Sequence, residues 1–141
     1  MIYFNVFGDF EDLKDPIKKN EEYIDGGYIS SFKIGEQTKK YTPSKFKIEE
    51  ENITALKNIV KDAEAKGIKV FLFQAPLPKE RYQSYENNKE IDSIMKSIGT
   101  YYNYNEVRFL PSQYFMDDSH INQNGVDVYN KWVIDKIKEN E

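Results

Sequence analysis

The apolar run at residues 68–73, Ile-Lys-Val-Phe-Leu-Phe, restricts the fold of this chain more than any other feature of the sequence. A nearly continuous apolar run of this length is typical of a strand that is buried on both faces of a sheet. Gly67 precedes the run, and an amphipathic helical pattern precedes Gly67. A helix, a glycine and a buried strand make half of a β-α-β unit. The sequence therefore predicts a parallel sheet covered by helices.

The helix before Gly67 is predicted from apolar residues that recur at spacings of three and four. Acidic residues at 49–51 lie at the N-terminal end of this pattern and Lys66 lies at its C-terminal end, as the helix dipole favours. Gly67 follows, and glycine commonly ends a helix. The apolar residues of this pattern are Ile53, Leu56, Ile59, Val60 and Ala63.

Further elements alternate along the rest of the chain. Prolines end the strand at 74–78, and this loop is a candidate pocket wall, because ligands gather beyond the carboxyl ends of parallel strands; a plain connection is the alternative. A short helix is predicted at 79–85, a second amphipathic pattern at 88–102 and a strand at 106–110. This alternation predicts an α/β three-layer sandwich with a mostly parallel sheet.

A C-terminal helix is predicted to begin near Asn124, with Asn124 as its N-cap and Gly125 as its first residue. The helical spacing predicts that one stripe of this helix is buried and that Trp132 lies on the flank of the stripe. The predicted stripe consists of Val126, Tyr129, Val133 and Ile137.

The N-terminal third has less regular patterning. Residues 1–10 read as a strand that ends at Gly8-Asp9, and residues 12–41 are polar and rich in turns, with one brief extended piece at 27–30. We therefore divide the chain into an N-terminal strand with an irregular polar segment, residues 1–45, and an α/β region, residues 46–141.

Composition excludes several classes of function. The chain has 141 residues, no cysteine, a single histidine and a net charge of −4. Without cysteine it forms no disulfide, no thiolate zinc site and no cysteine nucleophile, and we predict no metal or other cofactor. Basic residues do not cluster, so nucleic acid is not an expected partner. No apolar run approaches the roughly 20 residues that a membrane-spanning helix needs.

The single histidine, His120, is the main candidate for chemistry. It lies three residues after Asp117, a spacing at which a carboxylate can fold back onto the imidazole Nδ1 and leave Nε2 as a general base. Asp118 is the competing partner, and the sequence leaves the choice between the two carboxylates open.

The pattern Asp117-x-x-His120-x-Asn122-x-x-Gly125, at the start of a C-terminal helix, resembles the last conserved block of the SGNH/GDSL hydrolase superfamily. The order of elements over residues 46–139 is similar to the second half of SGNH-like cell-envelope acyltransferases, of the D-alanine transfer and polysaccharide O-acetylation types. This resemblance implies that Asp117 and His120 are the catalytic Asp and His of a Ser-His-Asp site, with an acylated glycan or a small ester as substrate.

The chain departs from that family in its nucleophile. Gly8-Asp9 is followed by Phe10, which has no hydroxyl, and the Gly-x-Asn-Asp block that supplies oxyanion donors is missing. Ser30, Ser31 and Ser119 do not lie in a strand-to-helix elbow. We therefore expect the chain by itself to be inactive, as a partial esterase or O-acyltransferase module that an upstream segment or another chain would complete.

Two alternatives to this interpretation remain open. One is a non-catalytic module that binds a glycan or a protein on a degenerate SGNH-like fold. The other is a purely structural His120, whose bonds to Asp117 fix the entry to the last helix.

If strands are missing, an exposed sheet edge predicts self-association. The expected location is the cell envelope if the chain belongs to a longer protein, and the cytoplasm if it is complete.

Overall fold

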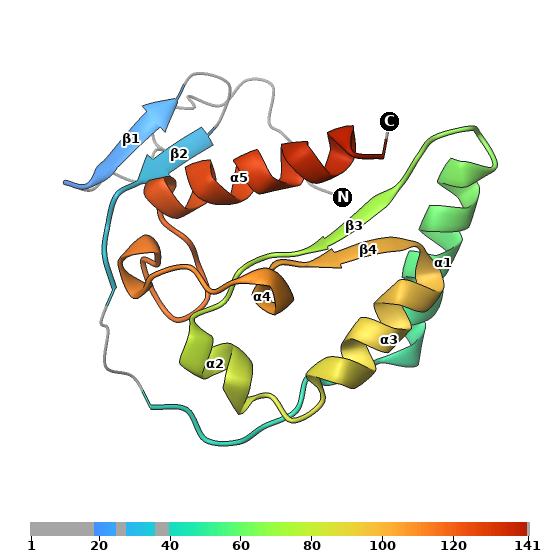
Figure 1. Cartoon of the computed structure of the whole chain (residues 1–141), viewed down its shortest axis with the longest axis horizontal. Helices are drawn as coiled ribbons and strands as arrows, with labels where there is room; N and C mark the ends of the chain where they lie inside the picture. The colour runs from blue at the N-terminus through green and yellow to red at the C-terminus, as the bar shows by residue number, and fades with distance from the viewer. Residues whose placement is uncertain (1–18, 25–27, 36–39, 141) are drawn as a thin grey trace, which may run out of the picture.

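The computed structural model describes residues 19–24, 28–35 and 40–140 (Figure 1). The predicted strand at 1–10, with Gly8-Asp9, lies outside these ranges. Within them the fold is α/β, with helices, one parallel strand pair and one antiparallel hairpin. The elements in chain order are β1 Glu21–Ile24, β2 Tyr28–Ser31, α1 Glu50–Glu64, β3 Phe71–Gln74, α2 Lys79–Ser84, α3 Asn88–Ile98, β4 Thr100–Asn103, α4 Tyr104–Val107, η2 Ser112–Tyr114 and α5 Gln123–Lys138.

Strands β3 and β4 form the parallel pair, with Phe71 opposite Thr100 and Gln74 opposite Asn103. Helix α5 lies on one side of this pair, and α1 and α3 lie on the other (Figure 1). The α/β class is therefore confirmed. The described residues contain only these two parallel strands, so the three-layer sandwich with a mostly parallel sheet remains a prediction.

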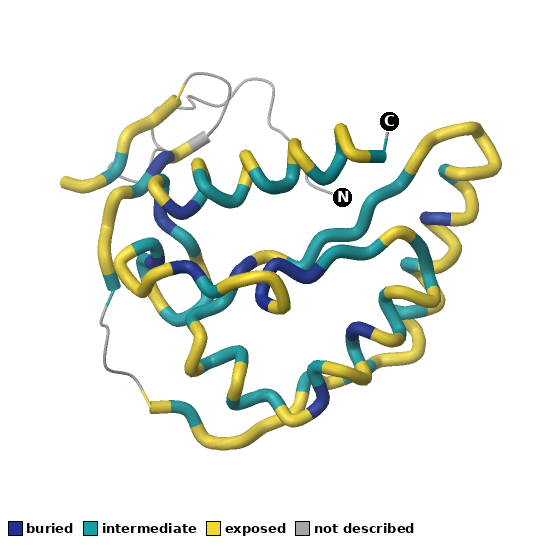
Figure 2. The backbone as a smooth tube through the Cα atoms, viewed as in Figure 1, coloured by how far each residue is buried: buried dark blue, intermediate teal, exposed yellow. Residues whose placement is uncertain are grey.

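The helices predicted before and after β3 are present as α1, α2 and α3, and Gly67 has a positive φ of 76°, as expected of a glycine that ends a helix. The strand itself differs from the prediction. It begins at Phe71 rather than Ile68, and all four of its residues are only half-buried (Figure 2). Burial on both faces is therefore wrong, because a cavity on the side of α1 and α3 reaches all four residues of β3.

The second predicted strand is misplaced. Residues 106–110 are not a strand; β4 comes earlier, at Thr100–Asn103, and the helical turn α4 follows it directly. The helical spacing of Ile91, Ile94, Met95 and Ile98 continues by chance into Tyr101 and Tyr102, which hides the start of β4. Helix α3 ends at Ile98, and the extended backbone of Gly99 leads into the strand.

The buried core lies between α4, α5 and the segment 109–115. Tyr104, Leu110 and Phe115 are buried, and Val128, Tyr129 and Trp132 of α5 pack against them. The ring of Trp132 meets that of Tyr104 edge-on, with centroids 5.0 Å apart. The predicted stripe of α5 is therefore partly wrong, since Trp132 lies against the core rather than on its flank.

The hairpin β1–β2 is antiparallel, with Glu21 opposite Ser31. Strand β2 confirms the extended piece predicted at 27–30 for its described residues, whereas β1 has no sequence signal that we recognised. Beyond the hairpin, Gly35 N–H donates to Phe115 O at 2.9 Å, which ties this segment to the core. No helix among the described residues is long and apolar enough to cross a bilayer.

Candidate functional site

The segment that carries Asp117 and His120 is a tight loop closed by backbone hydrogen bonds. Met116 N–H donates to His120 O at 2.9 Å, and Asn122 N–H donates to Tyr114 O at 2.8 Å. Residues 117–120 therefore form the tip of the loop, directly before α5. The loop has little freedom to rearrange without breaking these bonds.

Asn122 holds the base of this loop and caps α5. Its side-chain oxygen accepts from Gly125 N–H at 3.2 Å, and its Nδ2 donates to Gln113 O at 2.7 Å and to Lys33 O at 3.2 Å. The residue is almost completely buried. The predicted cap was Asn124, two residues too late, because Asn122 and Asn124 both suit an N-cap and the sequence does not show which side chain turns inward.

Asp117 pairs with His120. The imidazole Nδ1 lies 2.8 Å from Asp117 Oδ2 and 3.0 Å from Oδ1, and Oδ1 also accepts from the backbone N–H groups of Ser119 and His120, each at 2.8 Å. Burial raises the pKa of Asp117, but these hydrogen bonds and the nearby imidazole outweigh burial and lower it to about 2. The carboxylate is therefore charged at neutral pH.

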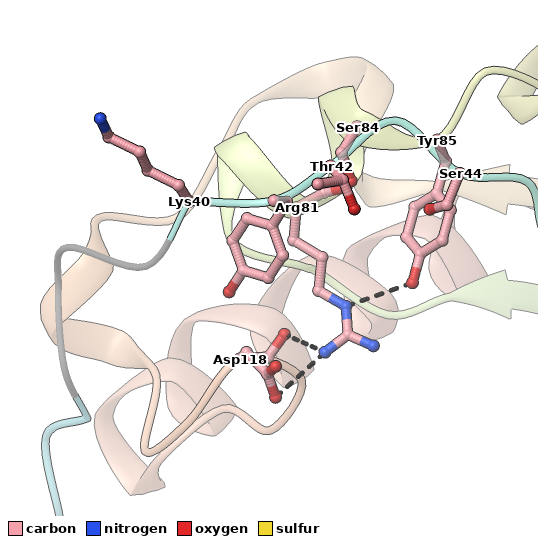
Figure 3. Close-up of a pocket in the computed structure, with 8 residues that line it drawn as sticks. Lys40, Thr42, Ser44, Arg81, Ser84, Tyr85 and Asp118 are labelled. Atoms are coloured by element: carbon pink, nitrogen blue, oxygen red, sulfur yellow. Dashed lines mark hydrogen bonds and ion pairs between the residues drawn. The ribbon is translucent and has the colours of Figure 1, made fainter.

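Asp118, the competing partner, turns to Arg81 of α2 instead. Arg81 Nη1 lies 3.1 Å from Asp118 Oδ1 and donates to Asp118 O at 2.7 Å (Figure 3). Burial lowers the pKa of Arg81, but its hydrogen bond to Tyr85 and the Asp118 carboxylate outweigh burial and raise it. The charged guanidinium thus ties the loop at residues 117–120 to helix α2 through Asp118.

The outer side of the imidazole is open. The side chain of His120 is 66% exposed, and no described residue hydrogen-bonds to Nε2. Ser119 Oγ lies 3.3 Å from Nδ1, on the side that faces Asp117. Ser30 is buried and donates to Glu22 O, and Ser31 Oγ accepts from Lys33 N–H. None of these three hydroxyls is therefore placed as a nucleophile for Nε2.

A buried polar network lies at the carboxyl ends of β3 and β4. Asp92 of α3 accepts hydrogen bonds from Tyr101 at 2.8 Å and from Asn103 at 2.9 Å. Asn103 in turn accepts from Asn105, which bonds Leu77 N–H at 2.8 Å and Ala75 O at 3.1 Å. This network fixes the loop 74–78, the predicted pocket wall.

Sequence reasoning missed this network, because the helical spacing that continues into Tyr101 and Tyr102 hides the strand that ends at Asn103. Gln74 and Pro78, at the two ends of this loop, line cavities. Pro76 between them is fully buried. The two ends of the loop therefore contribute to cavity walls, and its middle is packed at Pro76.

A polar cavity of about 310 Å³ lies beside the His120 loop, between α2 and the segment 40–44. We call it the Arg81 cavity; its lining residues are Lys40, Tyr41, Thr42, Ser44, Arg81, Ser84, Tyr85 and Asp118. Asp118 belongs both to this lining and to the loop of the Asp117–His120 pair.

No group of three or more His, Cys, Asp or Glu side chains within the described ranges is placed to hold a metal ion.

No protein-family model, curated protein or solved structure matches this chain. The resemblance to SGNH-like acyltransferases therefore stays a prediction from the sequence, based on the spacing of Asp117, His120, Asn122 and Gly125.

Proposed function

We propose that this chain is a partial SGNH-like hydrolase or acyltransferase module, on a three-layer fold, that supplies the Asp and His of a Ser-His-Asp site. Asp117 orients His120, and Nε2 of His120 is the general base for a nucleophile that an upstream segment or another chain provides. Esters of envelope glycans are the proposed substrates.

The observation that carries the proposal is the carboxylate of Asp117 within 3.0 Å of Nδ1, with the other side of the ring open. A carboxylate in this position favours the tautomer that has its proton on Nδ1 and stabilises the imidazolium that forms when Nε2 takes a proton. An exposed Nε2 can then reach a hydroxyl that approaches from outside.

A non-catalytic binding module is the second candidate. It is favoured by the Arg81 cavity, which lies beside the loop and is lined by hydroxyl-bearing and charged side chains, and by the lack of a hydroxyl at Nε2 among the described residues. In this case the pair of Asp117 and His120 only shapes the loop.

The first test measures the tautomer of His120 by ¹⁵N NMR at about pH 9, where imidazoles are neutral. We expect the proton on Nδ1 in the unmodified chain and on Nε2 in Asp117→Asn, because the amide replaces an acceptor with a donor. Asp118→Asn is the matched control and should keep the Nδ1 proton. The same tautomer in all three proteins would contradict an orienting role for Asp117.

The second readout is hydrolysis of p-nitrophenyl acetate. Because the described residues place no nucleophile at Nε2, we expect turnover by the 141-residue chain and by His120→Ala to differ by less than about threefold. Robust turnover that His120→Ala abolishes would show that the chain contains its own nucleophile. An in-frame Gly-x-Ser block encoded upstream of Met1 would support the partial-enzyme form over the binding module.

A further inference from the structure

We propose that the Arg81 cavity binds a small hydroxylated oxyanion, such as a sugar acid or a sugar phosphate, through the guanidinium of Arg81. The inference goes beyond the chemistry proposed at His120 and does not depend on it. It depends on three properties of the cavity, which are the unused donors of Arg81, the surrounding hydroxyls and the size of the space.

Arg81 is held in place while part of its guanidinium stays available. Nη1 bonds the main chain and carboxylate of Asp118, and Nε lies 3.3 Å from Tyr85 OH (Figure 3). The third nitrogen, Nη2, makes no hydrogen bond to any described residue. A guanidinium that is already oriented loses little further freedom when it binds, and its planar N–H groups suit the oxygens of a carboxylate or phosphate.

The charge of the cavity favours an anion. Of its two basic lining residues, Arg81 lies among the other lining side chains, whereas the side chain of Lys40 extends away from them (Figure 3). The Asp118 carboxylate is partly neutralised by its contact with Arg81. An anion that enters the cavity therefore meets the guanidinium of Arg81, whose Nη2 makes no hydrogen bond to a described residue.

Hydroxyl groups around Arg81 suit a ligand that has hydroxyls of its own. Within the described part of the chain, the hydroxyls of Thr42 and Ser44 have no hydrogen-bond partner. Ser84 Oγ donates to Arg81 O at 2.7 Å, and its oxygen can still accept. Hydroxyls both donate and accept, so several of them can bond the ring hydroxyls of a sugar.

Packing holds the walls of the cavity together. Ser44 N–H donates to Ser84 O at 3.0 Å, and Glu86 N–H donates to Ser44 O at 2.9 Å. The rings of Phe46 and Tyr85 stack with their centroids 3.8 Å apart. At about 310 Å³ the cavity is at the lower end of the range of ligand pockets, about 300–1,000 Å³. This volume suits one sugar ring rather than a chain of sugars.

The test is a ¹H–¹⁵N NMR titration of the full 141-residue chain with glucuronate, glucose 6-phosphate, inorganic phosphate and neutral glucose. We expect at least one of the two anions to shift the Arg81 Nε–H signal and the Ser44 and Ser84 amide signals, and glucose to shift none of them. Glucuronate alone, or glucose 6-phosphate alone, would identify the carboxylate or the phosphate as the preferred group.

Ser44→Ala removes one hydroxyl without touching the clamp on Asp118, and should weaken binding by about three- to tenfold, the usual value of one hydrogen bond. Ser97→Ala, on the exposed face of α3, is the matched control and should bind normally. His120→Ala should also bind normally, which separates this inference from the proposed chemistry. Arg81→Gln should abolish binding.

Three results would overturn the proposal. One is no shift with either anion at about a hundredfold excess over protein, where even a ligand with a Kd near 1 mM is detected. Another is an equal response to neutral glucose, which would remove the role of charge. The third is that inorganic phosphate alone binds as tightly as glucose 6-phosphate, which would remove the role of the hydroxyls.

Discussion

Asp117 serves two purposes with one carboxylate. Its Oδ1 closes the loop by accepting the N–H groups of Ser119 and His120, while both oxygens face the imidazole. A short polar residue that bonds the backbone two or three residues ahead is a common device in turns. The same interaction therefore fits a structural role and a catalytic one, and only a readout on His120 separates them.

The low pKa of Asp117, about 2, predicts how the stability of the chain depends on pH. An unfolded aspartate has a pKa of about 3.9, so the carboxylate stabilises the folded state above about pH 4 and loses this contribution as the pH falls toward 2. We expect urea unfolding to show Asp117→Asn as less stable than the unmodified chain at about pH 6. The two proteins should converge near pH 2.

The size of that difference should be modest, because the Asp117 side chain is 46% exposed and water screens its interactions. Asp118→Asn is a useful comparison, since Asp118 contacts Arg81 instead of the imidazole. A gap between Asp117→Asn and the unmodified chain that stays constant from pH 6 to pH 2 would contradict the assignment of the low pKa.

At the same scale, the sequence predicted a contact between His120 and a nearby carboxylate better than it predicted which carboxylate makes that contact. The spacing of Asp117 and His120 was enough to predict a contact, and the structure contains it. The choice between Asp117 and Asp118 needed the position of Arg81, which is 36 or more residues away in the chain. Such a partner has no local signal in the sequence.

At the scale of single elements, helices were predicted more accurately than strands. A helix of 11 to 16 residues repeats its apolar spacing several times, as α1, α3 and α5 do. Strands β3 and β4 have four residues each, too few to establish a period of two. The apolar run at 68–73 therefore gave the right place for β3 but the wrong extent of burial.

Asn122 is the residue whose loss should affect α5 most. Replacing an N-cap asparagine costs about 0.5–2 kcal/mol, and Asn122→Ala also leaves the carbonyls of Gln113 and Lys33 without their donor. We expect a loss of about 2–4 kcal/mol in the free energy of unfolding, measured by urea titration and circular dichroism.

Asn124→Ala is the matched control, because Asn124 is exposed and lies inside α5. Alanine favours helices more than asparagine does, so this variant should be neutral or slightly more stable. A larger loss of unfolding free energy for Asn124→Ala than for Asn122→Ala would mean that Asn124 is the N-cap, as the sequence alone predicted.

The two sides of the parallel pair differ in how well they are packed. On the α5 side Tyr104 is buried against Trp132 and Tyr129. On the α1 and α3 side, an apolar cavity of about 360 Å³ remains next to β3. In the described ranges β3 pairs with β4 alone, and self-association through a free strand edge stays a prediction.

This asymmetry could not be predicted from the sequence. Both sides present apolar residues at helical spacing, such as Ile91 and Met95 on α3 and Val128 and Trp132 on α5. The two sides differ in how many strands and aromatic rings pack against these apolar residues. That number depends on contacts between distant parts of the chain. Trp132 was therefore assigned to a flank, although it lies against the buried core.

The asymmetry predicts that truncations on the two sides have unequal costs. Tyr104→Ala removes a ring that is 1% exposed and should lower the free energy of unfolding by about 3–5 kcal/mol. Met95→Ala, beside the cavity, should cost less than about 2 kcal/mol, because its neighbours already lack contacts on one side. Urea unfolding followed by circular dichroism measures both, with the exposed Tyr23→Ala as control. Equal losses at Tyr104 and Met95 would mean that the cavity is filled in solution, by self-association or by residues outside the described ranges.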